Sequence, residues 1–112
     1  VQPGEKLLAT ATRLANQGHL DEAAKYCEDL LSRQTHQADA YYLLGVIREA
    51  AGNSEDAEQM FRRAVYLQPN YYEALVHLSV ICERSGDPDG ARRYLERAAR
   101  AQSRQPQSGA AK

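Results

Sequence analysis

The stretch ADAYYLLGVIREAAGNSEDAEQMFRRAVYLQPN, residues 38–70, predicts a pair of α-helices. Its first half carries apolar residues at helical spacing until Gly52 interrupts them, and a second stretch with the same spacing follows. Asn53 or Ser54 stands where the N-cap of the second helix is expected. Pro69 ends that helix, because proline disfavours helical backbone in the residue before it. We therefore expect two helices joined by a tight turn.

The same pattern returns every 34 residues, and five columns of residues keep this spacing. Each column holds one kind of side chain: glycine, alanine, acidic, small or bulky apolar. The columns are Gly18/Gly52/Gly86, Ala23/Ala57/Ala91, Asp21/Glu55/Asp89, Ala11/Gly45/Ser79 and Leu7/Tyr41/Leu75. Similar residues that recur at one fixed spacing along the chain identify an internal repeat. Its three copies run about 4–37, 38–71 and 72–105.

Small residues recur where the two helices of each copy are expected to cross. A tight crossing leaves room only for a small side chain. A glycine inside a helix costs about 1 kcal/mol relative to alanine, so close approach of the two helices explains Gly45 better than helix propensity does. We expect Gly45 to lie opposite Ala57 at this crossing.

The middle copy resembles the tetratricopeptide repeat (TPR). The residues that carry the resemblance are Tyr41, Leu44, Gly45, Gly52, Ala57, Phe61, Ala64 and Pro69. The outer copies depart from the pattern at Thr35 and Ser103, where the family favours proline, and terminal repeats are commonly atypical. The resemblance implies an all-α fold, a TPR-type right-handed solenoid of three antiparallel helix pairs over residues 4–105.

In this family the first helix of each pair lines the concave side of the solenoid. The resemblance therefore implies that a peptide or helix of another protein binds there. The matching positions form an apolar groove flanked by acidic residues, which suits an amphipathic ligand with basic edges. The candidate partner-binding residues are Leu8, Thr12, Asp39, Tyr42, Leu43, Val46, Glu49, Glu73, Val76, His77, Val80 and Glu83.

Two alternatives stay open for this surface. In the first, four of the candidates pack helix against helix between adjacent copies: Leu43, Val46, Val76 and Val80. In the second, the chain is a regulatory oligomerisation module whose groove is unused, and we expect a monomer or a weak homo-oligomer. TPR modules that clamp the acidic tails of chaperones use Lys, Asn and Arg on this side, and Leu8, Thr12 and Leu43 at matching positions disfavour that specificity.

The composition argues against several functions. The chain has 14 basic and 15 acidic residues and a net charge of -1, so no global field attracts nucleic acid or an anionic membrane. No apolar run approaches the ~20 residues of a membrane-spanning helix. Two cysteines are too few for a disulfide scaffold, which predicts a cytoplasmic setting. The arginines between residues 84 and 104 are expected to keep the outer face of the last helix soluble.

Nothing in the sequence points to catalysis by this chain. The three histidines are scattered without metal-ligand spacing, and there is no glycine-rich phosphate loop. We therefore expect no catalytic residue, no metal and no cofactor. Cys27 falls in a repeat column with Phe61 and Leu95 that we expect to be buried, where a free cysteine acts as a small hydrophobe.

Ala64, Tyr66, Leu67 and Pro69 form an A-x-Y-L-x-P pattern before the third copy. This pattern resembles the TPR segment that follows the catalytic domain in some bacterial chemoreceptor methyltransferases. The resemblance implies a parent enzyme that methylates receptor glutamates from S-adenosylmethionine, with this chain as a targeting or regulatory module. Its partner would then be a chemoreceptor or another signalling protein. Residues 106–112 are expected to form a flexible polar tail.

Overall fold

The computed structural model describes residues 4–34 and 36–104, so the tail expected at 106–112 lies outside the described residues. Within the described ranges the chain forms six α-helices and no strand. The helices are α1 (Gly4–Asn16), α2 (Leu20–Arg33), α3 (Ala38–Ala50), α4 (Ser54–Leu67), α5 (Tyr72–Arg84) and α6 (Pro88–Arg104). The predicted all-α class is therefore confirmed.

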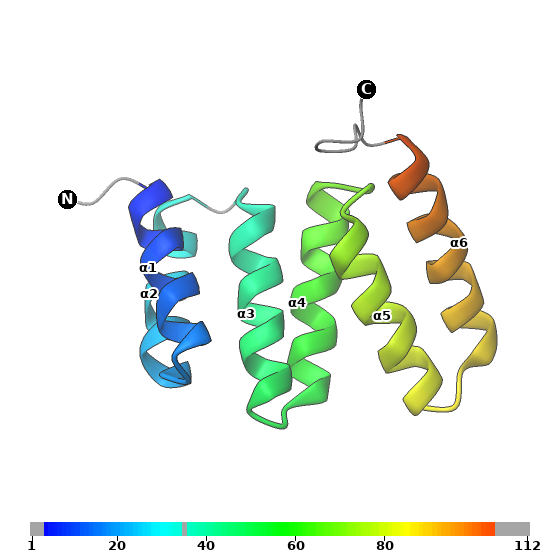
Figure 1. The fold of residues 1–112 in the computed structure, drawn as a ribbon, viewed down its shortest axis with the longest axis horizontal. Helices are drawn as coiled ribbons and strands as arrows, with labels where there is room; N and C mark the ends of the chain where they lie inside the picture. Colours follow the sequence, from blue (N-terminus) through cyan, green and yellow to red (C-terminus); the bar gives the residue numbers. More distant parts are fainter. Residues whose placement is uncertain (1–3, 35, 105–112) are drawn as a thin grey trace.

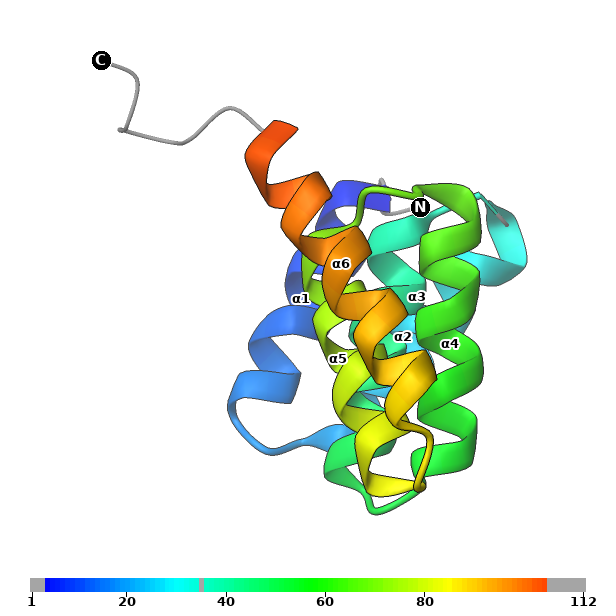
Figure 2. The ribbon, with the colours of Figure 1, turned by 90° about the vertical axis from the view of Figure 1, so that its right-hand side faces the viewer.

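The six helices stand side by side as three hairpins, α1–α2, α3–α4 and α5–α6 (Figure 1). Each hairpin also contacts the next one, through α2 against α3 and through α4 against α5. In the view along this row, α1 and α5 lie to one side and α4 to the other (Figure 2). The first helices of the two outer hairpins thus lie on the side away from α4 (Figure 2).

The glycine of each hairpin turn is explained by its backbone conformation and not by a lack of room for a side chain. Gly52 donates its N–H to the carbonyl of Glu49, and Asn53 donates to the carbonyl of Arg48. This pair of bonds is the Schellman ending, which needs a left-handed residue after the helix. A Cβ atom would meet nothing within 4 Å at any of the three turn glycines. Their φ angles are 86° at Gly18, 85° at Gly52 and 83° at Gly86.

Side chains cap two of the second helices at their N-termini. The Asn53 carbonyl oxygen Oδ1 accepts the backbone N–H of Asp56 at 3.3 Å, so Asn53 is the cap of α4. Oδ1 of Asp87 accepts the N–H of Gly90 at 2.9 Å, directly before Pro88 opens α6. Each cap satisfies a backbone donor that has no partner inside the helix.

The atoms closest to Gly45 belong to Phe61, which lies one turn along α4 from Ala57, the residue expected at this crossing. A Cβ atom on Gly45 would stand 2.7 Å from Cε1 of the Phe61 ring, and the three nearest atoms all belong to that ring. Ala57 and Phe61 are four residues apart and share a face of α4. The longer Phe61 side chain reaches the crossing first, and no methyl group fits between it and α3.

The repeat column of Cys27, Phe61 and Leu95 is buried only in its first two members. Cys27 shares a buried cluster with Leu44 and Ile47 of the following hairpin, and Phe61 is covered by His77 of the next. Leu95 is 51% exposed, contrary to the expected burial. The reason is that each column residue is covered by the next hairpin, and none follows α6 within the described ranges.

Candidate functional site

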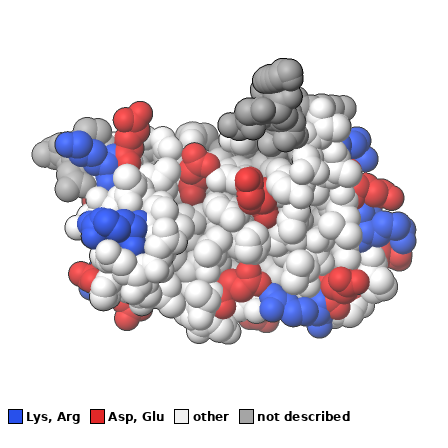
Figure 3. Space-filling view, in the orientation of Figure 1, with Lys and Arg blue, Asp and Glu red and all other residues white. Residues whose placement is uncertain are grey.

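The twelve candidate residues lie on α1, α3 and α5, and none of them is fully buried. We call the surface that they define the first-helix face. Figure 3 looks onto this side of the molecule, where acidic side chains stand singly across the middle and the larger basic areas lie toward the edges. The surface between them carries no charge, as a groove for an apolar ligand requires.

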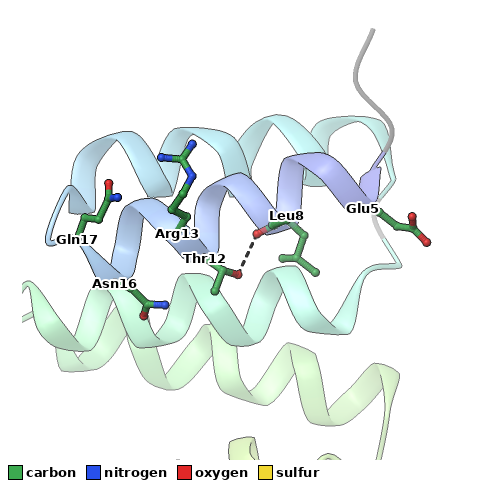
Figure 4. Close-up of a pocket in the computed structure, with 7 residues that line it drawn as sticks. Glu5, Leu8, Thr12, Arg13, Asn16 and Gln17 are labelled. Atoms are coloured by element: carbon green, nitrogen blue, oxygen red, sulfur yellow. Dashed lines mark hydrogen bonds between the residues drawn. The ribbon is translucent and has the colours of Figure 1, made fainter.

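A shallow, open hollow of about 660 Å³ runs along α1 on the first-helix face, and we call it the α1 hollow. Leu8 and Thr12 lie at its centre, and the hydroxyl of Thr12 donates to the carbonyl of Leu8 at 2.9 Å (Figure 4). The hydroxyl is therefore turned to its own helix, and a methyl group remains for contact. The lining residues are Glu5, Leu8, Ala9, Thr12, Arg13, Asn16 and Gln17.

A second, smaller hollow of about 330 Å³ joins the start of α1 to the start of α3. It shares Glu5 and Leu8 with the α1 hollow and reaches Asp39 on α3. Gln34 and Gln37 complete it, with the Gln37 amide donating to the side chain of Gln34 at 2.5 Å. The first-helix face is thus continuous from Thr12 to Asp39 along its N-terminal edge.

Between α3 and α5 the same face is filled by aromatic rings. Tyr42 stacks on Tyr71 with ring centroids 5.1 Å apart, and it meets Phe61 at 5.8 Å and His77 edge-on at 5.7 Å. His77 itself stacks on Phe61 at 4.6 Å. Such pairs add stability beyond the apolar area that they bury. Tyr42 and His77 therefore hold two hairpins together as well as facing outward.

Polar contacts also connect α3 with the start and the end of α5. The Tyr71 hydroxyl donates to Oδ1 of Asp39 at 2.5 Å, and Oε1 of Glu49 lies 3.1 Å from Nδ1 of His77. The other Glu49 oxygen accepts from the guanidinium of Arg84. Asp39 and Glu49, two of the four candidate acids on this face, thus have partners within the chain. The other two, Glu73 and Glu83, are exposed.

Burial and nearby carboxylates alter the two tyrosines of this cluster. Burial raises the pKa of the Tyr71 phenol far above its usual value of 10.0, and the hydrogen bond to Asp39 raises it further. Burial also raises the pKa of Tyr42, with a smaller contribution from Glu73. Both phenols are therefore neutral at physiological pH and act as hydrogen-bonding groups, not as anions.

The four aliphatic candidates differ in how they are packed. Leu43 packs against the buried cluster of the first two hairpins, and Val46 and Val76 pack against the cluster of the last two. Val80, by contrast, is 45% exposed. These side chains are half-buried between hairpins, apart from Val80, and present an outer edge to solvent.

Sequence reasoning missed several residues of this surface. Arg13 and Gln17 line the α1 hollow, and Gln37 lines the smaller one. Tyr71 occupies the repeat position of Gln37, one residue before the first helix of its hairpin. The repeat could have predicted Gln37 and Tyr71, because both stand one residue before a first helix, at the edge of the first-helix face.

Three stacked hairpins with capped turns and a shared first-helix face define a helical-repeat domain of the solenoid class. The chain belongs to the tetratricopeptide repeat family, since two family models described as tetratricopeptide repeat match residues 8–72 and 50–112. The TPR-type right-handed solenoid expected from the sequence is therefore confirmed. No helix among the described residues combines the length and the apolar character needed to cross a membrane.

The chain is similar to two proteins named "Probable biofilm formation methyltransferase WspC". It is 44% identical to the one from Pseudomonas putida over 96 residues, which cover 86% of this chain and 23% of that protein. It is 41% identical to the one from Pseudomonas aeruginosa over 88 residues, which cover 79% of this chain and 21% of that protein. The chain thus spans less than a quarter of the length of these relatives, and it resembles their TPR segment.

Among solved structures, the fold is similar to that of PcrH in complex with the chaperone binding region of PopB. The TM-score is 0.84 at 25% sequence identity, and the match covers 92% of this chain and 83% of PcrH. PcrH from Pseudomonas aeruginosa gives a TM-score of 0.83 at the same identity, with 92% of this chain and 78% of that chain covered. The tetratricopeptide solenoid is thus a fold that presents surfaces to other proteins.

Proposed function

We propose that the first-helix face binds a peptide or a helix of a partner protein. The observation that carries the proposal is the α1 hollow, an open depression that has Leu8 and Thr12 at predicted contact positions and Ala9 in its lining. No neighbouring helix lines it, so its apolar side chains are available to a ligand. An exposed apolar surface along one helix can take a helix or an extended peptide of a partner.

The structural neighbours support this mode of binding. PcrH, which is 25% identical, has a solved complex with the chaperone binding region of PopB. A similar solenoid therefore accommodates a segment of another protein. For the present chain we place the ligand across Leu8, Thr12 and the outer edges of Leu43 and Val46.

The charges of the face favour a ligand with basic edges. Glu73 and Glu83 are exposed on α5, and Glu5 is exposed at the start of α1. Asp39 and Glu49 contribute less to a ligand because Tyr71, His77 and Arg84 already engage them. Rim charges of this kind act mainly on association rate and specificity.

We further propose that the chain is a targeting or regulatory module of a chemoreceptor methyltransferase that works in the cytoplasm. The support is the 44% identity to the WspC segment from Pseudomonas putida. The methyl-transfer chemistry would reside in another part of such a parent, and this chain would recruit a chemoreceptor or another signalling protein. Removal of the module would then lower receptor methylation without changing methyl transfer to a free glutamate-containing peptide.

Site-specific photo-crosslinking in cells tests the binding face. A benzoylphenylalanine at position 12 is expected to capture a discrete protein, because Thr12 lies in the α1 hollow. The control places the same probe at position 25, since Lys25 is exposed on α2 and away from the face. The captured protein, once purified, should bind a Leu8→Glu variant at least about tenfold more weakly and a Lys6→Glu variant normally. Equal capture at both positions would contradict the proposal.

A second candidate function is oligomerisation, with the first-helix face unused. The observation in its favour is the end of the solenoid, where Leu95 on α6 is 51% exposed. Sedimentation velocity of the chain and of a Leu95→Glu variant separates the two functions. A dimer that dissociates on this substitution, together with no capture at position 12, would favour oligomerisation.

A further inference from the structure

A separate hollow lies between α4 and α6, with Leu78 of α5 in its lining. Its larger part measures about 380 Å³ and is lined by Arg62, Val65, Tyr66, Pro69, Leu78, Tyr94 and Arg97. A smaller part of about 200 Å³ is lined by Pro69, Asn70, Arg97, Arg100 and Ala101. Pro69 and Arg97 belong to both parts, so the two form one surface, which we call the arginine hollow.

The arginine hollow is positively charged although the chain as a whole is not. Three arginines line it, and no Asp or Glu is among its lining residues. Arg62 is paired with Glu58 at 2.7 Å, and the guanidinium of Arg97 lies 5.8 Å from the ring centroid of Tyr94. Among the described residues, no carboxylate lies within ion-pairing distance of Arg97 or Arg100. Two cations here are thus available to an external anion.

The floor and one wall of the arginine hollow are apolar. Val65 and Leu78 form a buried floor, and Tyr94 is half-buried beside them. Tyr66 stands at the rim with 85% of its surface exposed, the most exposed of the large hydrophobic residues. Tyrosine and arginine are both enriched among the residues that contribute most to binding energy in protein interfaces. The hollow therefore offers both an apolar anchor point and a charge.

We propose that the arginine hollow is a second protein-binding site, which takes an acidic segment that carries one aromatic or aliphatic side chain. The apolar side chain would insert over Val65 and Leu78 against Tyr66, and carboxylates of the segment would pair with Arg97 and Arg100. Arginine favours this pairing because its planar fork donates two parallel hydrogen bonds to a carboxylate. The site is independent of the first-helix face, so the module would bridge two proteins.

The same residue types also bind single-stranded nucleic acid, but the geometry favours a peptide. A nucleic-acid surface needs a continuous basic track with aromatic rings for successive bases. Here the arginine hollow is short, and the exposed acids Asp89 and Glu96 stand on the same helix as Arg97 and Arg100. The inner floor is apolar, which suits a side chain of a protein better than a phosphate backbone.

Fluorescence anisotropy with a labelled twelve-residue peptide of glutamates around one phenylalanine tests this site. We expect saturable binding that weakens as salt rises. The Arg97→Glu/Arg100→Glu variant should lose at least about tenfold in affinity, since each lost charge-assisted contact costs on that order. The matched control is Arg92→Glu/Arg93→Glu, which changes the net charge equally on α6 outside the lining and should stay within about threefold.

A Tyr66→Ala variant provides a second test that does not depend on α6, in case the two charge reversals on that helix disturb its structure. Tyr66 is so exposed that its truncation should leave the melting temperature unchanged, yet we expect a loss of peptide affinity of at least about fivefold. Equal losses in the Arg92/Arg93 control, or no binding at millimolar peptide, would overturn the proposal. Tighter binding of a twelve-nucleotide single strand that displaces the peptide would overturn it in favour of nucleic acid. Self-association abolished by Tyr66→Ala would assign the hollow to a second copy.

Discussion

The imidazole of His77 lies flat on the ring of Phe61, with the ring centroids 4.6 Å apart and the planes inclined by 18°. Phe61 belongs to α4 and His77 to the next hairpin, so this stack joins two repeats. Atoms Cδ1, Cε1 and Cζ of the same Phe61 ring are the nearest neighbours of Gly45 on α3. One phenylalanine therefore sets both the crossing inside the middle hairpin and its contact with the third.

The close approach of Phe61 predicts the effect of adding one methyl group at position 45. A Gly45→Ala substitution should lower the free energy of unfolding by about 1–3 kcal/mol, because the new Cβ overlaps the ring. In a Phe61→Leu background the same change should cost less than about 0.5 kcal/mol. Urea denaturation of the four variants measures this, and an equal cost in both backgrounds would contradict the contact.

The first hairpin provides a natural comparison. Ala11 and Cys27 occupy the repeat positions of Gly45 and Phe61, and both are buried in one cluster. Glycine in this repeat column thus occurs in the hairpin whose second helix carries phenylalanine, the bulkier residue.

A different cause makes Gly52 sensitive to substitution. Its φ of 85° lies in the left-handed region, and open space surrounds it. Gly52→Ala should therefore cost about 1–2 kcal/mol from backbone strain alone. Gly52→Asn should cost less, because asparagine tolerates this region. Thermal unfolding distinguishes the two variants, and identical melting temperatures for alanine and asparagine would argue against strain.

The hydrogen bond from Tyr71 to Asp39 should couple α3 to α5. Tyr71→Phe removes the donor and is expected to cost about 1 kcal/mol. Adding Asp39→Asn to it should cause little further loss, which gives a coupling energy of about 1 kcal/mol in a double-mutant cycle. Tyr72→Phe is the matched control, since the neighbouring tyrosine is half-buried and its hydroxyl has no such bond. Strict additivity of Tyr71→Phe and Asp39→Asn would disprove the coupling.

The Cys27 thiol should be unreactive in the folded protein. Burial, with a smaller effect of Glu28, raises its pKa from 9.0 to about 12. Little thiolate therefore exists at pH 8, and the thiolate is the reacting form. In a Cys82→Ser background, the thiol of Cys27 should react slowly with a disulfide reagent in buffer. In about 6 M guanidinium, where the protein is unfolded, the reaction should be fast. Rapid reaction in buffer would mean that the first two hairpins open readily.

The same shift predicts a loss of stability at high pH. The folded state holds the Cys27 proton more tightly than the unfolded state, so this stabilisation is complete below pH 9.0. It decreases as pH rises toward about 12, where the folded protein also loses the proton. Denaturation at pH 8 and pH 10 compares the two conditions, and Cys27→Ala should be less sensitive than the native chain.

The local pattern of the sequence was enough to predict each hairpin. Helical spacing of apolar residues, a glycine with positive φ after the first helix, and Asn53 as a cap act within a few neighbouring residues. Such short-range effects are readable in a single chain because they depend on backbone conformation and on side chains one turn apart. The 34-residue spacing then predicted that the hairpins stack.

Contacts between hairpins could not be predicted from the sequence, because they depend on the angle and offset at which neighbouring repeats pack. The repeat placed Tyr42 and His77 on one face but did not predict that they touch each other or that Tyr71 joins them. It placed Leu95 in a buried column, although burial there needs a further hairpin. The arginine hollow likewise joins residues of α4 and α6 that lie about one repeat apart, and only the packing of three helices brings Tyr66 beside Arg97.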